Sequence, residues 1–167
     1  MEFLDETSDL FCSGSDDGLI KVWDRRCLRG DRPKPAGVFV GHLCGITHMN
    51  SKGDGRYLIS NSKDQTIKLW DVRKMVEPAS ARMPPRSSWD YRQGIYWVSR
   101  ERQLFNGAKS HRQDVSLMTY RGHDVARTLI RSYFSPAHST GQRYIYTGSC
   151  SGKITSKPSP SVRCETN

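Results

Sequence analysis

The sequence predicts an all-β fold built from repeated four-stranded antiparallel units, and three observations support this. Residues 13–26 (SGSDDGLIKVWDRR) and 60–73 (SNSKDQTIKLWDVR) align without a gap at an offset of 60 − 13 = 47 residues. In both copies apolar residues alternate with lysine, which is the period of a β-strand. A Gly-His pair at residues 41–42 recurs at residues 122–123. Repetition every ~40–50 residues with a Trp-Asp ending is typical of β-propeller blades.

The first unit begins in the middle of a blade. Residues 10–13 form the expected second strand, and residues 20–23 alternate apolar and polar side chains as the third. Asp17 lies between them in an Asp-Asp-Gly turn, where short polar residues and glycine suit the backbone. Trp23 and Asp24 end the third strand, and no strand is predicted before residue 10.

The second unit is predicted to be complete. Its strands are expected at residues 46–50, 57–60 and 66–70, with a tight turn at residues 63–65. An outer strand at residues 116–120 follows after a long connection. This unit is therefore the best place to test the sequence pattern against a structure.

The third unit lacks its ending. After the second Gly-His pair, strands are expected at residues 128–134 and 144–149, and the pattern continues to Ile154. No Trp-Asp follows. Residues 155–160 (TSKPSP) are predicted not to form a central strand, because proline has no amide to donate. We expect residues 155–167 to be a disordered tail outside the repeats.

These units predict one domain at residues 1–154, a partial β-propeller of about two to three four-stranded blades. Known propellers close a ring of ~4–8 blades. An incomplete ring leaves sheet edges open, so the sequence predicts a truncated propeller rather than a closed one.

A long basic insertion is predicted at about residues 74–115. Between residues 72 and 118 there are nine lysines and arginines and four acidic residues, so this stretch contributes 9 − 4 = +5 to a net charge of +9. It also carries the aromatic residues Trp89, Tyr91, Tyr96 and Trp97. Aromatic and arginine side chains together are typical of docking loops. A solvated basic loop is the plainer and favoured explanation of the charge, and nucleic-acid binding is the less favoured reading.

Composition excludes some classes of protein. No apolar run approaches the ~20 residues of a membrane span, so we expect no membrane partner. The acidic start (MEFLDETSDL) does not resemble a signal peptide. The five cysteines contain no C-x-x-C spacing, which favours reduced thiols in the nucleus or cytoplasm over disulfides or a metal site. No cofactor is expected.

The Gly-His and Trp-Asp markers resemble those of the WD-repeat propeller family. The resemblance implies one buried hydrogen-bond network in each blade. In the second unit it would join His42, Asp64, Trp70 and a strand serine, either Ser60 or Ser62. Trp23, Asp17 and His123 would hold the equivalent positions in the other two units. A buried network of this kind is stable only when its polar groups satisfy one another.

Serine, histidine and aspartate together also suggest a catalytic triad. Repetition of the trio from blade to blade is typical of architecture rather than of an active site. No Gly-x-Ser-x-Gly motif supports catalysis either. We therefore predict no catalytic residues and no enzyme activity.

Both Trp-Asp pairs continue as W-D-x-R, at residues 23–26 and 70–73. This resembles the paired motif of WD-repeat substrate receptors of cullin-4 RING ubiquitin ligases. The resemblance implies that Asp24, Arg26, Asp71 and Arg73 contact the ligase adaptor, damage-specific DNA-binding protein 1. Arginine suits such a contact because its planar group carries five donors and stays charged. A chance arginine that caps the strand end is the plainer alternative.

Four longer stretches are similar in sequence to the cullin-4-associated factors and resemble plant members most. They are residues 51–74, 89–92, 119–123 and 134–149. Residues 93–113 and everything after Ile154 depart from that pattern. The resemblance implies a non-catalytic receptor that holds a protein substrate near the ligase, and such proximity is its mechanism. The alternatives are a generic WD-repeat scaffold and a basic nucleic-acid-binding propeller fragment.

Overall fold

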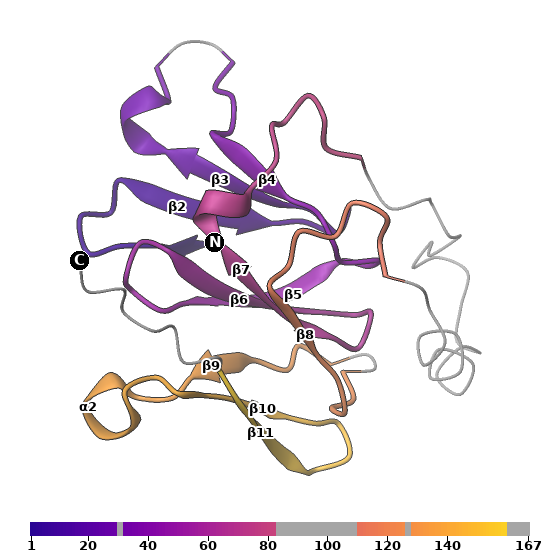
Figure 1. Cartoon of the computed structure of the whole chain (residues 1–167). Coiled ribbons are helices and arrows are strands. Elements are labelled where there is room, and N and C mark those ends of the chain that lie inside the picture. The colour runs from indigo at the N-terminus through magenta and orange to yellow at the C-terminus, as the bar shows by residue number, and fades with distance from the viewer. Residues whose placement is uncertain (30–31, 83–109, 126–127, 160–167) are drawn as a thin grey trace.

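The computed structural model describes residues 1–29, 32–82, 110–125 and 128–159 of the chain. In this part of the chain eleven strands form three antiparallel sheets. Figure 1 shows the sheets stacked face to face in chain order. The predicted all-β fold, a partial propeller with an open ring, is confirmed.

The first two sheets have four strands each, which are hydrogen-bonded in sequence order. The first contains β1 (Glu2–Phe3), β2 (Leu10–Gly14), β3 (Ile20–Asp24) and β4 (Gly37–Phe39). The second contains β5 (Ile46–Ser51), β6 (Tyr57–Ser62), β7 (Ile67–Asp71) and β8 (Met118–Tyr120).

The third sheet has three described strands: β9 (Ser132–Phe134), β10 (Tyr144–Gly148) and β11 (Ile154–Pro158). A short helix α2 (Ala137–Thr140) lies between β9 and β10. Single 3-10 turns, η1 (Arg25–Cys27) and η2 (Val72–Lys74), follow β3 and β7.

Two expectations at the ends of the chain are wrong. A strand does precede residue 10, because β1 pairs with β2 through Glu2–Cys12 and Phe3–Phe11. Two residues are too few to show a strand period in the sequence. Its presence makes the first sheet four-stranded rather than a sheet that begins with its second strand.

The expected tail also begins too early. β11 pairs with β10 along its whole length, from Ile154–Gly148 to Pro158–Tyr144. The proline argument applies to central strands, but β11 is at the edge of its sheet and Pro158 is its last residue. Residues 160–167 lie outside the described part of the chain.

Two hydrophobic clusters join the sheets. Between the first and second sheets, Phe39 packs on Trp70 with ring centroids 5.3 Å apart, within a cluster that also contains Cys12, Ile20 and Leu58. A second cluster joins Ile59 and Leu69 of the second sheet to Phe134 and Ile145 of the third. All residues of β6 and β7 are consequently buried, because this sheet is covered on both faces.

The basic insertion leaves and rejoins the fold at neighbouring points. Gln113 accepts a hydrogen bond from the Arg82 amide at 3.0 Å and donates to the Ser80 carbonyl at 2.8 Å. Val76 pairs with Val38 beside β4. The central part of the insertion, with Trp89, Tyr91, Tyr96 and Trp97, lies outside the described residues.

Candidate functional site

A buried polar network lies at the heart of the second sheet. His42 Nδ1 is 2.9 Å from Asp64 Oδ2, and His42 Nε2 is 2.6 Å from Ser60 Oγ. Trp70 Nε1 donates to the same Ser60 oxygen at 2.7 Å. The Ser60 hydroxyl therefore donates to histidine and accepts from tryptophan, while the other histidine nitrogen donates to Asp64.

Of the two serines left open by the sequence, Ser60 takes the bridging position. Ser62 instead donates to the Cys44 carbonyl at 2.9 Å. Gly41 precedes the histidine for a steric reason, since a β-carbon there would lie 2.9 Å from the Trp70 ring. The Gly-His marker thus reflects close packing against the strand tryptophan.

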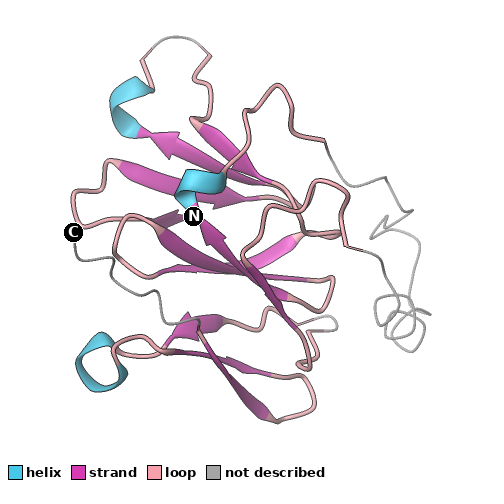
Figure 2. Ribbon diagram, viewed as in Figure 1, coloured by secondary structure: helices cyan, strands magenta, loops and turns pink. Residues whose placement is uncertain are grey.

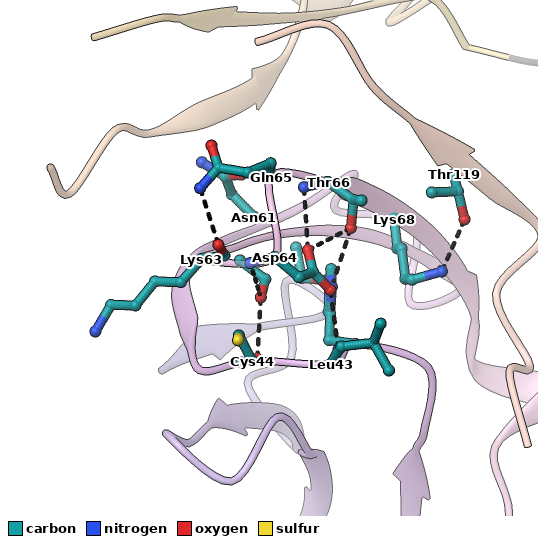
Figure 3. A network of polar contacts seen from close by, with 12 residues as sticks. Leu43, Cys44, Asn61, Lys63, Asp64, Gln65, Thr66, Lys68 and Thr119 are labelled. Carbon is teal, nitrogen blue, oxygen red and sulfur yellow. Dashed lines mark hydrogen bonds and ion pairs between the residues drawn. The ribbon is translucent and has the colours of Figure 1, made fainter. Parts of the chain in front are cut away.

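Asp64 gathers further donors. Its carboxylate accepts hydrogen bonds from the Leu43 amide at 2.9 Å and from the Thr66 amide and hydroxyl at 3.0 and 2.6 Å (Figure 3). Burial favours the neutral acid, but the electrostatic interaction with His42 and the hydrogen bonds from His42, Thr66 and Leu43 outweigh it. Together they lower the pKa of Asp64 to about 2.

This geometry does not suit nucleophilic catalysis by these three residues. Ser60 is 0% exposed, His42 1% and Asp64 2%. The serine oxygen is already engaged by both His42 and Trp70. A nucleophile needs an accessible oxygen activated by its base, so the trio acts as a structural clamp between strands.

The other two sheets carry only parts of the network. In the first, Trp23 Nε1 donates to Ser13 Oγ at 2.9 Å, and Asp17 accepts the Leu19 amide at 2.9 Å within its turn. Among the described residues, His123 bonds to an amide rather than to an acid. Its Nε2 lies 2.9 Å from Asn61 Oδ1 of the second sheet, so it ties two blades together.

The two W-D-x-R segments share one local conformation. Asp24 caps η1 by accepting the Arg26 amide at 2.9 Å, and Asp71 caps η2 by accepting the Arg73 amide at 3.0 Å. A carboxylate at this position satisfies an otherwise unpaired turn amide, which explains the aspartate physically. Figure 2 shows both turns at the same end of the stacked sheets.

The side chains of the two arginines differ. Asp24 accepts Arg26 Nε at 3.0 Å and Nη2 at 2.8 Å, a two-point ion pair with Arg26 67% exposed. The hydrogen bonds from Arg26 lower the pKa of Asp24 and raise that of Arg26. Arg73 makes no such pair, because Arg56 occupies Asp71 Oδ2 at 3.1 and 3.0 Å.

Arg56 was missed by sequence reasoning, although the repeat contains the signal. At the 47-residue offset it aligns with Asp9 (56 − 47 = 9), which pairs with Arg25 at 3.0 Å in the first unit. The first two sheets thus each carry an ion pair at this strand end with opposite charges at the aligned positions 9 and 56, although the partners differ by one position, since Arg25 aligns with Val72 and Asp71 with Asp24. This arrangement leaves Arg73 and Lys74 as exposed cations on η2 that are not paired with Asp71.

Residues 4–24 and 33–71 match the family model described as "WD domain, G-beta repeat". These segments are WD40 repeats. The resemblance expected from the Gly-His and Trp-Asp markers is confirmed. The WD40 match ends at Asp71, so η2 and the third sheet lie beyond the matched residues.

Two relatives align with most of this chain. "LEC14B protein" of Lithospermum erythrorhizon is 55% identical over 148 residues, which are 88% of this chain and 30% of the relative. "DDB1- and CUL4-associated factor 11 homolog" of Caenorhabditis elegans is 47% identical over 157 residues, 91% of this chain and 26% of the relative. The chain therefore spans under a third of the length of these relatives.

Other kinds of site find little support in the part of the chain that the structure describes. No group of three histidine, cysteine or acidic side chains gathers there as a metal site would require. No described helix is both long and apolar enough to cross a membrane.

Proposed function

We propose that this chain forms the adaptor-docking part of a substrate receptor of a cullin-4 RING ubiquitin ligase, acting inside the cell without chemistry of its own. The observation that carries the proposal is the pair of W-D-x-R turns: η1 contains Arg26, η2 contains Arg73, and both turns lie at the same end of the stacked sheets (Figure 2). The printed name of the nematode relative, which refers to DDB1 and CUL4, supports the same proposal.

The mechanism is positional. One rim binds the adaptor, and another surface of the complete receptor holds a protein substrate within reach of the ubiquitin-loaded enzyme. Proximity of this kind converts an encounter between molecules into a reaction within one complex. Partner and substrate both belong to the proposal, because the chain covers only part of its relatives.

Capture of the purified adaptor by the immobilised chain tests this function. Arg26→Ala/Arg73→Ala should abolish capture, because each substitution removes a rim cation with planar donors. Arg25→Ala/Lys74→Ala is the matched control, since it removes two positive charges from exposed positions in the same two turns.

The control variant should retain capture. Equal loss in both double variants would contradict a specific role for W-D-x-R and favour non-specific attraction by a basic surface. Unchanged capture in both double variants would show that this rim does not contact the adaptor, and would favour a generic WD40 scaffold.

A further inference from the structure

The two W-D-x-R turns have nearly the same backbone, but their aspartates bind different arginines. Asp24 has φ −104° and ψ 116°, and Asp71 has φ −114° and ψ 123°. Each uses its Oδ1 to accept the amide two residues further along the chain. Backbone geometry therefore does not explain why Asp24 binds the guanidinium of Arg26, whereas Asp71 binds that of Arg56.

The second carboxylate oxygen shows where the two turns differ. Asp24 Oδ2 accepts Arg26 Nη2 at 2.8 Å. Asp71 Oδ2 instead accepts Arg56 Nε at 3.1 Å and Nη2 at 3.0 Å. The position of the first sheet that aligns with Arg56 is Asp9 (56 − 47 = 9), whose negative charge cannot pair with Asp24. The sign of the charge at this one position thus accounts for which arginine the aspartate holds.

Arg56 is held beside Asp71 by its surroundings. Its amide donates to Asp54 Oδ1 at 2.9 Å, and its carbonyl accepts the amide of Val72, the first residue of η2, at 2.9 Å. Its guanidinium carbon lies 4.7 Å from the centroid of the Tyr57 ring, within the range of a cation–π contact. These contacts fix the Arg56 side chain where it reaches the carboxylate of Asp71.

The two arginines of the rim consequently differ in what they offer a partner. Arg26 already donates to Asp24 through two nitrogens. Arg73 is exposed, and among the described residues no acidic side chain forms an ion pair with it. A planar cation that is not engaged within its own chain can bind a partner without first breaking an internal ion pair.

We propose that Arg56 is a positioning residue of the adaptor-docking rim, because it occupies Asp71 and keeps the Arg73 guanidinium available to the adaptor. This proposal rests on the proposed ligase function. Without Arg56, the vacated Asp71 Oδ2 would bind Arg73 as Asp24 binds Arg26, in the backbone conformation that the two turns share. Arg56 thus acts through Arg73 and not by touching the adaptor itself.

Calorimetric titration of the whole chain with the purified adaptor tests the positioning role. Arg56→Gln should weaken binding by about two- to fivefold, the range expected when an exposed ion pair must first be broken. Lys52→Gln is the matched control and should leave the affinity unchanged. Lys52 Nζ lies 5.5 Å from the centroid of the same Tyr57 ring, but its ion-pair partner is Asp54 rather than Asp71.

Asp71→Asn separates positioning from direct contact. Asparagine keeps an oxygen that can cap η2, but it has no negative charge with which to capture Arg73. Arg56→Gln should therefore have no effect on affinity when it is introduced into the Asp71→Asn variant. An equal loss of affinity in both backgrounds would assign Arg56 a direct contact with the adaptor and overturn the positioning role.

Nuclear magnetic resonance of the arginine side chains tests the same exchange without the adaptor. In the unchanged chain, the Nε–H of Arg26 should exchange with water more slowly than that of Arg73, because it is bonded to Asp24. In Arg56→Gln the Arg73 Nε–H should slow to about the rate of Arg26.

The two measurements distinguish failure of the positioning role from failure of the proposed function. Adaptor binding by the unchanged chain, together with an Arg73 exchange rate that Arg56→Gln does not alter, would overturn the positioning role alone. No adaptor binding by the unchanged chain would overturn the proposed function, and the positioning role with it.

Discussion

At the scale of single residues, Ser60 stabilises the second sheet through two buried hydrogen bonds. Its hydroxyl is hydrogen-bonded to both His42 and Trp70, whose rings also meet edge to face with centroids 5.6 Å apart, and all three side chains are buried. Sequence reasoning identified the members of this network but left Ser60 and Ser62 as alternatives. The choice depends on which serine hydroxyl lies within hydrogen-bond distance of the Trp70 indole on the neighbouring strand. Residue spacing along the chain does not give this distance between strands.

Ser60→Ala should lower the free energy of unfolding by about 2–4 kcal/mol, because it leaves two buried polar groups unpaired. Ser13→Ala removes the equivalent hydroxyl beside the half-buried Trp23 and should cost about 1 kcal/mol or less. Urea unfolding followed by circular dichroism measures both. Equal losses would contradict the role assigned to burial.

Acid should destabilise the fold in two stages. Burial lowers the pKa of His48 and His123 below 6.5 in the folded chain. The unfolded chain therefore binds protons first, so stability is complete above pH 6.5 and falls as the pH drops below it. The pKa of Asp64 is lowered from 3.8 to about 2, so its contribution is lost only between those values.

The midpoint of urea unfolding, measured from pH 8 to about pH 2, reports these stages. His48→Gln/His123→Gln should remove most of the first stage and leave the second. A first stage that persists unchanged in this variant would assign it to other groups.

At the scale of elements, strand β8 is fixed by a buried lysine. Lys68 Nζ on β7 donates to Asp114 Oδ2 at 2.5 Å and to Thr119 Oγ1 at 2.7 Å (Figure 3 shows the Thr119 bond). These bonds attach the end of the basic insertion to the second sheet. The repeat predicted the alternation around Lys68, but not its partners, because Asp114 lies 46 residues away.

Lys68→Met should lower the free energy of unfolding by about 2 kcal/mol, because Asp114 loses its cation in a mostly buried position. It should also speed hydrogen exchange in residues 114–120. Lys21→Met, at the same repeat position (68 − 47 = 21) in the first sheet, is the control and should change little. Faster exchange in both variants would contradict a specific anchor for β8.

At the scale of the whole molecule, the repeat predicted the stack but not its ends. A period of 47 residues with Gly-His and Trp-Asp markers located the complete second sheet. β1 was missed because two residues show no period, and β11 was misjudged because an edge strand tolerates proline. The ion pairs at the rim were not predicted, because the aligned position is an acid, Asp9, in the first unit and a base, Arg56, in the second.

The central claim is that the rim of these WD40 repeats binds a ligase adaptor through Arg26 and Arg73. The most direct test is calorimetric titration of the chain with purified adaptor, damage-specific DNA-binding protein 1, at low and physiological salt. We expect saturable binding at both, and a loss of about a hundredfold or more in Arg26→Ala/Arg73→Ala. Loss of binding at physiological salt, or equal affinity of the adaptor for the unchanged chain and for the double variant, would contradict a specific role of Arg26 and Arg73.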